Sequence, residues 1–390
     1  MYKKIEIGNL VTLRQGFAIN KKTNHHMSEE PTQLHLLRIG DMKDGKFSIF
    51  VKDTIPEKFI AKEDDIIYTR TGQVGLVFRK QHGVVHNNCF TVTSNDLNIL
   101  QQEFLFYALQ EKSFYEEAIS RATGAAQPDL PHGAFNSIQI FLPPIESQKK
   151  ISNILNTYDN LIENNQKQIK LLEEAAQRLY KEWFVDLRFP GHENTKIIDG
   201  IPEGWSKGTL GDIAINTGNN EKKENRINYS YYLPIDCLPK KSLVYTESND
   251  INMAKSSLVS FNPKDIIFGA MRPYFHKVVI AREKGLTRST CFVINSKNDI
   301  YWSYLTMLLF SDNTINYATR ISVGTTMPYV RWKNFVQMPI LIPSVSICTK
   351  YKQFFSPIVD KLSELAEKMT KLKQARDLLL PKLISGELEV

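Results

Sequence analysis

Two features that would point to a membrane or secreted protein are missing from this chain. None of its 390 residues lies in an apolar run approaching the ~18 residues of a membrane-spanning helix. The lysines at the start are not followed by the apolar segment of a signal peptide. The four cysteines are widely spaced, which favours reduced thiols over a disulfide framework: Cys89, Cys237, Cys291 and Cys348. We therefore expect a cytoplasmic protein with no membrane partner.

Motifs that bind cofactors are missing as well. No G-x-G occurs, so the chain has no dinucleotide or S-adenosylmethionine loop of the usual kind. The only Gly-Lys pair, Gly45-Lys46, is followed by Phe47 and is not a Walker A loop. The motifs G-x-S-x-G and H-E-x-x-H are also absent, as is the Pro-Pro-aromatic signature of adenine methyltransferases. These absences predict a chain without a catalytic centre or a cofactor of its own.

The composition is that of an ordinary globular protein. Hydrophobic residues make up 42% of the chain and charged residues 23%, which excludes wholesale disorder. At about 150 residues per domain, the length predicts two or three domains. A net charge of +7 permits a nucleic-acid partner without requiring one.

An internal repeat is the main signal in the sequence. Glycine, proline and phenylalanine recur at a constant offset of 200 residues, in the pairs Gly124/Gly324, Pro128/Pro328, Phe135/Phe335 and Pro143/Pro343. Asp65-Ile66-Ile67-Tyr68 likewise matches Asp265-Ile266-Ile267-Phe268. The chain is therefore predicted to hold two tandem copies of one unit and to form a pseudo-twofold molecule.

Each copy is predicted to begin with a mixed α/β globule. Short β-branched and aromatic runs separated by Gly, Asn and Pro indicate strands and turns. A helical stretch is expected late in each globule, over 103–121 and 300–317. The predicted boundaries are 1–143 for the first globule, 144–189 for a central helix, 190–206 for a linker, 207–343 for the second globule and 344–390 for a C-terminal helix and tail.

Each globule is followed by a predicted long helix with a heptad seam. Apolar residues recur in steps of four and three from Ile151 to Trp183, and again from Tyr351 to Leu379. The principal seam positions are Ile151, Leu155, Ile162, Ile169, Leu172, Leu179, Phe355, Leu362, Met369, Leu372 and Leu379. We expect the two helices to pair as a coiled coil, with Asn165 fixing the register at a cost in stability; the alternative is that each packs on its own globule. Pro190-Gly191 and Pro381 are expected to end them.

Polar loops carry the candidate binding residues. Arg, Gln, Asn and Thr are the side chains that read base edges, and glycines allow backbone amides to approach phosphates. The loops differ between the copies while their flanking frame repeats, as expected for two modules that read different sequences; surface loops free to drift are the alternative. The candidates are Arg14, Gln15, Thr69, Arg70, Gln73, Gln127, Asn219, Asn220, Arg272, Tyr274, Thr325 and Arg331.

One cluster has the spacing of metal ligands. His82, His86 and Cys89 are four and three residues apart, as in some zinc sites. The second copy has Cys291 but no matching histidines, and no fourth ligand is evident. We favour a polar turn that leads into a buried cysteine and predict no metal.

The whole layout resembles the specificity subunit of a Type I restriction-modification system. The similar stretches are 123–128 with 142–151, the segment 179–189, the segment 201–205 and the C-terminal segment 381–388. Ser344 to Cys348 departs from the family's pattern, which has Glu-Gln there. The resemblance covers essentially the whole chain.

The resemblance implies an α+β fold with two target-recognition domains separated by two long antiparallel coiled-coil helices. It implies a non-catalytic subunit that reads a bipartite, asymmetric site in double-stranded DNA. Two methyltransferase subunits would dock on it, using S-adenosylmethionine to methylate adenine, and motor-nuclease subunits would use ATP and Mg²⁺. No cofactor would then bind this chain itself.

Two other functions stay open at this point. A stand-alone DNA-binding regulator with duplicated reading domains would need no methyltransferase, and a pull-down from native cells separates the two. An enzyme with a concealed site would most plausibly use His82, His86 and Cys89, which metal analysis of the purified chain would reveal.

Overall fold

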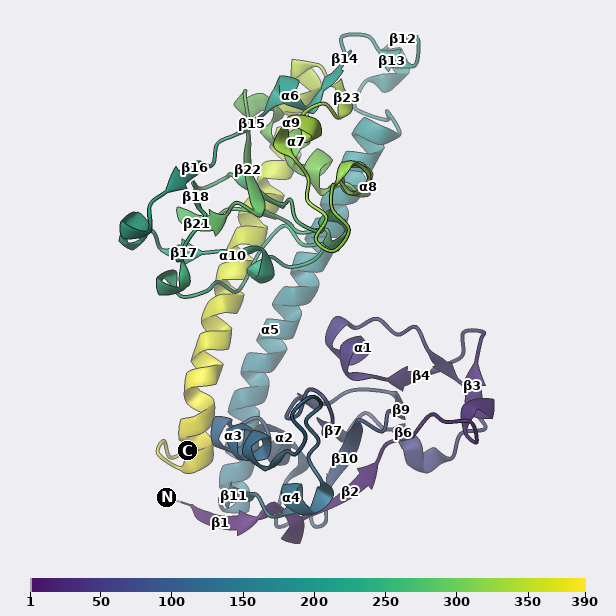
Figure 1. The fold of residues 1–390 in the computed structure, drawn as a ribbon, viewed down its shortest axis with the longest axis vertical. Helices are drawn as coiled ribbons and strands as arrows, with labels where there is room; N and C mark the ends of the chain where they lie inside the picture. Colours follow the sequence, from purple (N-terminus) through teal and green to yellow (C-terminus); the bar gives the residue numbers. More distant parts are fainter. Residues whose placement is uncertain (1) are drawn as a thin grey trace. The chain divides into compact units, whose positions relative to one another are not determined.

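The computed structural model describes residues 2–390, which fall into two compact units (Figure 1). Unit 1 runs up to Asn160 and includes Lys373–Val390. Unit 2 is Leu161–Leu372. Two long helices, α5 (Ile145–Tyr180) and α10 (Val345–Ser385), contribute segments to both units. Within residues 2–390, no helix combines the length and apolar character needed to span a membrane.

The globule of unit 1 is built on three sheets. The order β2-β10-β7-β8 forms an antiparallel sheet, β3-β5-β4-β9-β6 forms a second sheet, and β1 pairs with β11. The strands are β1 (Lys3–Glu6), β2 (Val11–Gln15), β3 (Met27–Ser28), β4 (Leu34–Leu37), β5 (Phe50–Val51), β6 (Ile60–Ala61), β7 (Ile66–Thr69), β8 (Val77–Phe78), β9 (Gly83–Val85), β10 (Cys89–Ser94) and β11 (Gln139–Leu142). The helices besides α5 and α10 are α1 (Ile39–Asp44), α2 (Gln102–Ala108), α3 (Lys112–Arg121) and α4 (His132–Asn136).

The globule of unit 2 repeats the main sheet in the order β15-β22-β19-β20, and its second sheet has the order β16-β18-β21-β17. The strands are β12 (Ile197–Ile198), β13 (Ile201–Pro202), β14 (Ser206–Thr209), β15 (Ala214–Asn216), β16 (Asn219–Glu221), β17 (Tyr231–Tyr232), β18 (Leu258–Phe261), β19 (Ile266–Gly269), β20 (Val278–Ile280), β21 (Gly285–Arg288), β22 (Cys291–Ser296) and β23 (Pro339–Ile342). The short helices are α6 (Leu210–Ile213), α7 (Trp302–Phe310), α8 (Asp312–Ile321) and α9 (Trp332–Phe335).

The duplication predicted from the sequence is present in the fold. The two main sheets have the same strand order, and β14 pairs with β23 as β1 pairs with β11. Equivalent glycines allow the chain to pass close to the end of α4 or α9 in both globules. A Cβ on Gly8 would lie 2.6 Å from Asn136 Cβ, and a Cβ on Gly211 would lie 3.2 Å from Val336 Cβ. These contacts explain why glycine recurs at this position in both copies.

The single helix expected late in each globule is two helices. In unit 1, α2 ends at Ala108 and α3 begins at Lys112, capped by the Glu111 carboxylate. In unit 2, Ser311 separates α7 from α8, and its hydroxyl accepts a hydrogen bond from the Thr314 amide. Such caps satisfy amides at the start of the second helix, so the chain can turn there without orphaned donors.

In unit 1 the two long helices pair in opposite directions. Asp159 of α5 forms an ion pair with Arg376 of α10 at 2.9 Å. One to two turns further on, Ile151 and Leu155 join the same buried cluster as Leu383 and Ile384. Moving back along α5 therefore means moving forward along α10.

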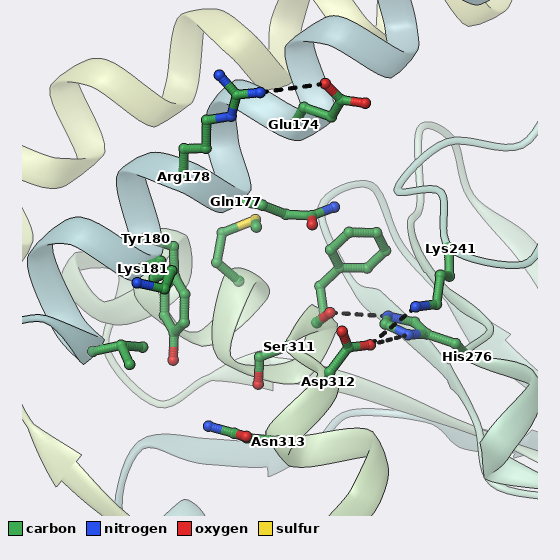
Figure 2. Close-up of a pocket in the computed structure, with 13 residues that line it drawn as sticks. Glu174, Gln177, Arg178, Tyr180, Lys181, Lys241, His276, Ser311, Asp312 and Asn313 are labelled. Atoms are coloured by element: carbon green, nitrogen blue, oxygen red, sulfur yellow. Dashed lines mark hydrogen bonds and ion pairs between the residues drawn. The ribbon is translucent and has the colours of Figure 1, made fainter.

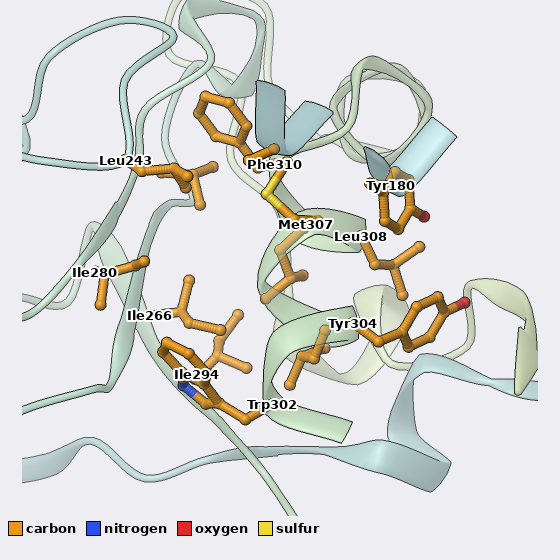
Figure 3. Packing of buried hydrophobic residues seen from close by; sticks show 14 of the residues in the cluster. Tyr180, Leu243, Ile266, Ile280, Ile294, Trp302, Tyr304, Met307, Leu308 and Phe310 are labelled. Atoms are coloured by element: carbon orange, nitrogen blue, oxygen red, sulfur yellow. The ribbon is translucent and has the colours of Figure 1, made fainter. Parts of the chain in front are cut away.

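In unit 2 the pairing is largely apolar. Ile162, Ile169 and Ala176 of α5 share a core with residues of α10, and Trp183 packs against Tyr351 at 5.6 Å between ring centroids. Figure 3 shows how Tyr180 lies beside side chains of the globule in this core. Asn165 is 2% exposed in the seam, and its Nδ2 has no hydrogen-bond partner among the described residues. A buried amide in this state costs stability, as the sequence predicted.

Both helices of unit 2 also hold one segment of its globule. The Glu173 carboxylate of α5 accepts hydrogen bonds from the Ser242 hydroxyl and the Leu243 amide, each at 2.7 Å. From α10, the Thr370 hydroxyl donates to the Thr246 carbonyl at 3.0 Å. Glu173 is 6% exposed, and burial raises the pKa of its carboxyl to about 7, outweighing the two hydrogen bonds that lower it.

The predicted helix ends were wrong at two places. Pro381 does not stop α10, which continues to Ser385 because Leu383 and Ile384 are buried in the core of unit 1. The first helix does not run regularly to Pro190: α5 gives way to a π-helical turn over Lys181–Val185. This wider turn brings two consecutive residues, Trp183 and Phe184, into the core, which a regular α-helix with one apolar stripe does less readily.

Candidate nucleic-acid interface

We call the globule of unit 1 repeat one and the globule of unit 2 repeat two. The candidate interface in each repeat is a pair of loops tied together by equivalent backbone hydrogen bonds. We call the loop after β7 or β19 the strand loop (70–76 and 270–277), and the loop before α4 or α9 the Gly-Pro loop (123–129 and 323–329). In repeat one the Gly72 amide donates to the Pro128 carbonyl at 2.8 Å; in repeat two the Arg272 amide donates to the Pro328 carbonyl at 2.7 Å. The two loops of each repeat therefore form one surface.

In repeat one, Asp129 holds Arg70 inside this loop pair. The Arg70 guanidinium donates through Nε to one Asp129 oxygen at 3.0 Å and through Nη2 to the other. Its third nitrogen, Nη1, donates to Gln15 Oε1 at 3.1 Å. The hydrogen bond from Arg70 is the main reason that the pKa of Asp129 lies below its usual value. Arg70 and Gln15, both predicted as base readers, are thus brought together, but they bind each other and Asp129.

Two further predicted residues of repeat one are engaged within the domain. Arg14 donates to the Asp65 carboxylate at 2.7 Å and to the Thr91 hydroxyl at 3.2 Å. Thr69 is fully buried, and its hydroxyl donates to the Gln73 carbonyl. The buried hydroxyl of Thr69, the last residue of β7, also accepts from the Leu76 amide at 2.9 Å, so it binds the backbone of the strand loop.

Gln73 and Gln127 are the predicted residues of repeat one with exposed side chains. Gln73 lies in the strand loop, where its Oε1 accepts a 3.4 Å hydrogen bond from Lys43. Gln127 lies in the Gly-Pro loop beside Pro128. The two side chains come from the two tied loops, so they belong to the same surface.

In repeat two, Arg272 occupies a different place from Arg70. Arg70 corresponds to Ala270, since Leu130 and Val330 donate their amides to the carbonyls of Arg70 and Ala270, each at 2.9 Å. Arg272 corresponds instead to Gly72. Its Nη2 donates to the Thr326 carbonyl at 3.3 Å, and its buried Nε has no partner among the described residues. In contrast to Arg70, this guanidinium has no carboxylate partner within residues 2–390.

The remaining predicted residues of repeat two are exposed. Tyr274 is 49% exposed in the strand loop, and Thr325 is exposed in the Gly-Pro loop. Arg331 is exposed just before α9, and Asn219 and Asn220 are exposed on β16. The structure places the first three on or next to the loop pair and the two asparagines on the neighbouring sheet.

The backbone of the two strand loops is similar although the residues differ. Gly72 and Gly75 have φ of +82° and +93° in repeat one. Their counterparts, Arg272 and His276, have φ of +51° and +52°. The left-handed region suits glycine and disfavours residues with a Cβ, so repeat two keeps two side chains at a cost in backbone energy.

Three residues of the loop pairs were missed by sequence reasoning. Asp129 forms an ion pair with Arg70. The His276 ring binds the Phe310 carbonyl and so anchors the strand loop of repeat two, and Phe275 is exposed beside Tyr274. The repeat itself held the signal, because Asp129 follows the repeated proline, Pro128, where the second copy has Tyr329 after Pro328.

A cavity of about 530 Å³ opens in unit 2 near the base of this loop (Figure 2). It is lined by apolar side chains such as Tyr180, Met307 and Phe310. His276, Asp312 and Lys241 interact along one side of it, as the dashed lines in Figure 2 show. Arg178 and Glu174, which also line the cavity, form a second ion pair at 3.8 Å.

The described residues offer no metal site. Within residues 2–390, no three His, Cys, Asp or Glu side chains are close enough to share an ion. His82 is exposed and Cys89 is fully buried. Burial raises the pKa of the Cys89 thiol to about 12, so it is a poor thiolate donor.

Comparison with known proteins assigns this fold to a family. The model of the Type I restriction modification DNA specificity domain matches twice, over residues 1–174 and 202–376. The chain is 28% identical over 348 residues to the Type I restriction enzyme MjaIX specificity subunit of Methanocaldococcus jannaschii, covering 83% of this chain and 78% of that one. It is 22% identical over 429 residues to the HindI specificity subunit of Haemophilus influenzae, covering 90% and 94%.

A solved structure shares the fold. The Type I restriction-modification S subunit from M. genitalium superposes with a TM-score of 0.64 at 17% identity, covering 98% of this chain and 96% of that one. Two family domains in tandem, each a mixed α/β globule with a long helix, define the class of molecule. The chain belongs to the family of Type I restriction-modification specificity subunits.

Proposed function

We propose that each loop pair reads one half of a bipartite, asymmetric site in double-stranded DNA. The observation that carries this is the tied loop pair, which recurs beside main sheets of the same strand order but with different side chains. In repeat one it exposes Gln73 and Gln127; in repeat two it exposes Tyr274 and Thr325. Different side chains on equivalent loop pairs are expected to select different bases.

The chain is further proposed to act as a non-catalytic partner. Two methyltransferase subunits would dock on it and supply adenine methylation with S-adenosylmethionine, and motor-nuclease subunits would supply ATP- and Mg²⁺-dependent restriction. The matches to specificity subunits support this, as does the lack of cofactor motifs in the sequence. The cytoplasm is the compartment in which this chain would meet those partners and the DNA.

Methylome sequencing tests the reading function. Cells that express the chain with its methyltransferase subunits should show one methylated motif with two half-sites. Gln127→Ala should relax one half-site and Thr325→Ala the other, each by about tenfold, because a good side-chain contact discriminates by ~1–3 kcal/mol. If either variant alters both half-sites, or if no motif is methylated, the proposal is wrong.

A further inference from the structure

The strand loop of repeat two ends in two exposed aromatic rings. Tyr274 is 49% exposed and Phe275 is 36% exposed, and their ring centroids lie 4.8 Å apart. They sit on a 3-10 turn over Pro273–Phe275. Large adjacent rings at the tip of a tight turn are unusual on a surface that has no partner to contact.

This turn is held firmly from both sides. Its flanking residues, Arg272 and His276, are both left-handed. The Phe275 amide donates to the Arg272 carbonyl at 3.0 Å, and the Lys241 amide donates to the His276 carbonyl at 2.8 Å. The His276 ring is 4% exposed and its Nε2 lies 2.9 Å from the Phe310 carbonyl oxygen. Figure 2 shows this ring beside Asp312, whose carboxylate oxygen lies 3.3 Å from His276 Nδ1.

Two cationic side chains accompany the tip. The Lys240 ammonium lies 5.3 Å from the centre of the Phe275 ring, and Arg272 begins the turn. Lys241 is close by but pairs with Asp312 at 3.2 Å. Aromatic rings interleaved with cations suit a polyanion that offers flat apolar faces, which is the chemistry of DNA bases on a phosphate backbone.

Repeat one has no such tip. Gln73 and Val74 stand at the corresponding part of its strand loop, and Val74 is 4% exposed. Its left-handed positions are glycines, which bring no side chain. Repeat two thus keeps two strained residues and gains a rigid aromatic tip in the same place.

We propose that Tyr274 and Phe275 form a wedge that enters a base step of the half-site read by repeat two and unstacks it. The proposal rests on the DNA-reading function above and adds its mode. Rigid insertion exchanges base stacking for ring-base stacking, while Lys240 and Arg272 meet the flanking phosphates. Steps that unstack easily would be favoured, so this half-site would be selected partly by deformability.

The test uses the complex of this chain with its methyltransferase subunits and duplexes carrying its methylated motif. 2-Aminopurine is placed at each successive position of the repeat-two half-site except the methylated adenine. We expect its fluorescence to rise at one step on binding. The double substitution Tyr274→Ala/Phe275→Ala should abolish the rise and weaken binding about tenfold or more, in line with the loss of one stacked base. Phe275→Trp should retain the rise.

Matched controls separate the possible outcomes. Met253→Ala removes another exposed apolar side chain of the same globule, 56% exposed and outside the loop, and should change neither signal. No rise at any step with the unmodified chain, or an unchanged rise in the double variant, overturns the wedge while leaving the reading function intact. Loss of methyltransferase binding in the double variant would instead make the tip a protein contact and overturn the wedge. Absence of any specific DNA binding would mean that the reading function has failed.

Discussion

The two units hold their helices and globules together by opposite means. In unit 1 a charged residue on α5 is the centre of the contact: Asp159 accepts from Arg376 of α10 at 2.9 Å, from Arg79 at 3.1 Å and from the Tyr107 hydroxyl at 2.7 Å. Arg79 also stacks on Phe106 at 4.1 Å. Two arginines and a tyrosine from three parts of the chain thus share one carboxylate.

In unit 2 the equivalents of Asp159 and Arg376 are Val359 and Ala176, both buried and apolar. The carboxylate that anchors the globule there is Glu173, which accepts from a hydroxyl and an amide and, among the residues that the structure describes, has no ion-pair partner. The same repeated frame therefore tolerates a half-buried carboxylate paired with two arginines in one unit and a buried carboxylate bonded to a hydroxyl and an amide in the other. We therefore expect the two units to respond in opposite ways: removing the Asp159 charge should destabilise unit 1, and removing the Glu173 charge should stabilise unit 2.

Removing Asp159 should have the largest effect. Asp159→Ala leaves Arg79 and Arg376 without their shared partner and should destabilise unit 1 by about 3 kcal/mol. All four tryptophans lie in unit 2, so far-UV circular dichroism in denaturant should show an earlier transition while tryptophan fluorescence does not. Asp360→Ala, an exposed aspartate on α10, is the control and should be neutral. An unchanged first transition would show that the charged centre is dispensable.

Neutralising Glu173 should stabilise unit 2 at high pH. Its folded pKa, about 7, is above the ordinary value of 4.5, so the folded state holds this proton more tightly. The contribution of this carboxyl to the free energy of unfolding is greatest below about pH 4.5 and is lost as the pH rises to about 7. Glu173→Gln should remove that dependence, with a gain above pH 7 of up to about 3 kcal/mol and little change at pH 4.5.

Tryptophan fluorescence in denaturant at several pH values measures this effect. Glu174→Gln, the adjacent position with a side chain 41% exposed, should leave the pH profile as it is. A Glu173→Gln protein that is less stable at pH 8 would show that the ionised carboxylate is the favoured form after all.

Exchange at the left-handed positions should have the smallest effect and opposite signs. Gly72→Ala adds a Cβ at φ +82°, where nothing lies within 4 Å of it, so the cost is backbone strain of about 1 kcal/mol. Arg272→Gly should raise the stability of unit 2 by up to about 1 kcal/mol and at the same time weaken specific DNA binding. Melting temperatures and binding to the methylated motif are measured on both variants. A less stable Arg272→Gly protein would mean that the arginine side chain supports the fold.

Much of the fold could be predicted from the internal repeat and from the heptad spacing of apolar residues. The offset of 200 residues predicted the duplicated frame, and the heptad steps predicted burial at Ile151, Leu155 and Ile169. The division between α2 and α3 was missed because it depends on the Glu111 cap within an otherwise helical pattern. Pro381 was misjudged because tertiary burial of Leu383 outweighs the helix-breaking tendency of proline.

The loops were located but their side-chain partners were not. Arg70 and Arg272 look equivalent in the sequence, since both follow the repeated Asp-Ile-Ile strand. Only the fold shows that one pairs with Asp129, 59 residues away, and that the other stands in a position that glycine fills in repeat one. Long-range pairing and the sign of φ are not encoded in local pattern.

The tie between the strand loop and the Gly-Pro loop has a consequence for how such a protein can change by recombination. Without Asp129, the Arg70 guanidinium would lose its carboxylate partner. Without the carbonyls of Thr326 and Pro328, the strained backbone and the guanidinium of Arg272 would lose the hydrogen bonds that hold them. A crossover between the two loops would separate such partners, whereas one on either side of both would carry them together. The smallest block that recombination can exchange intact is then about 70 residues, spanning β7 to α4 or β19 to α9, and exchange of that block should leave the recipient frame intact.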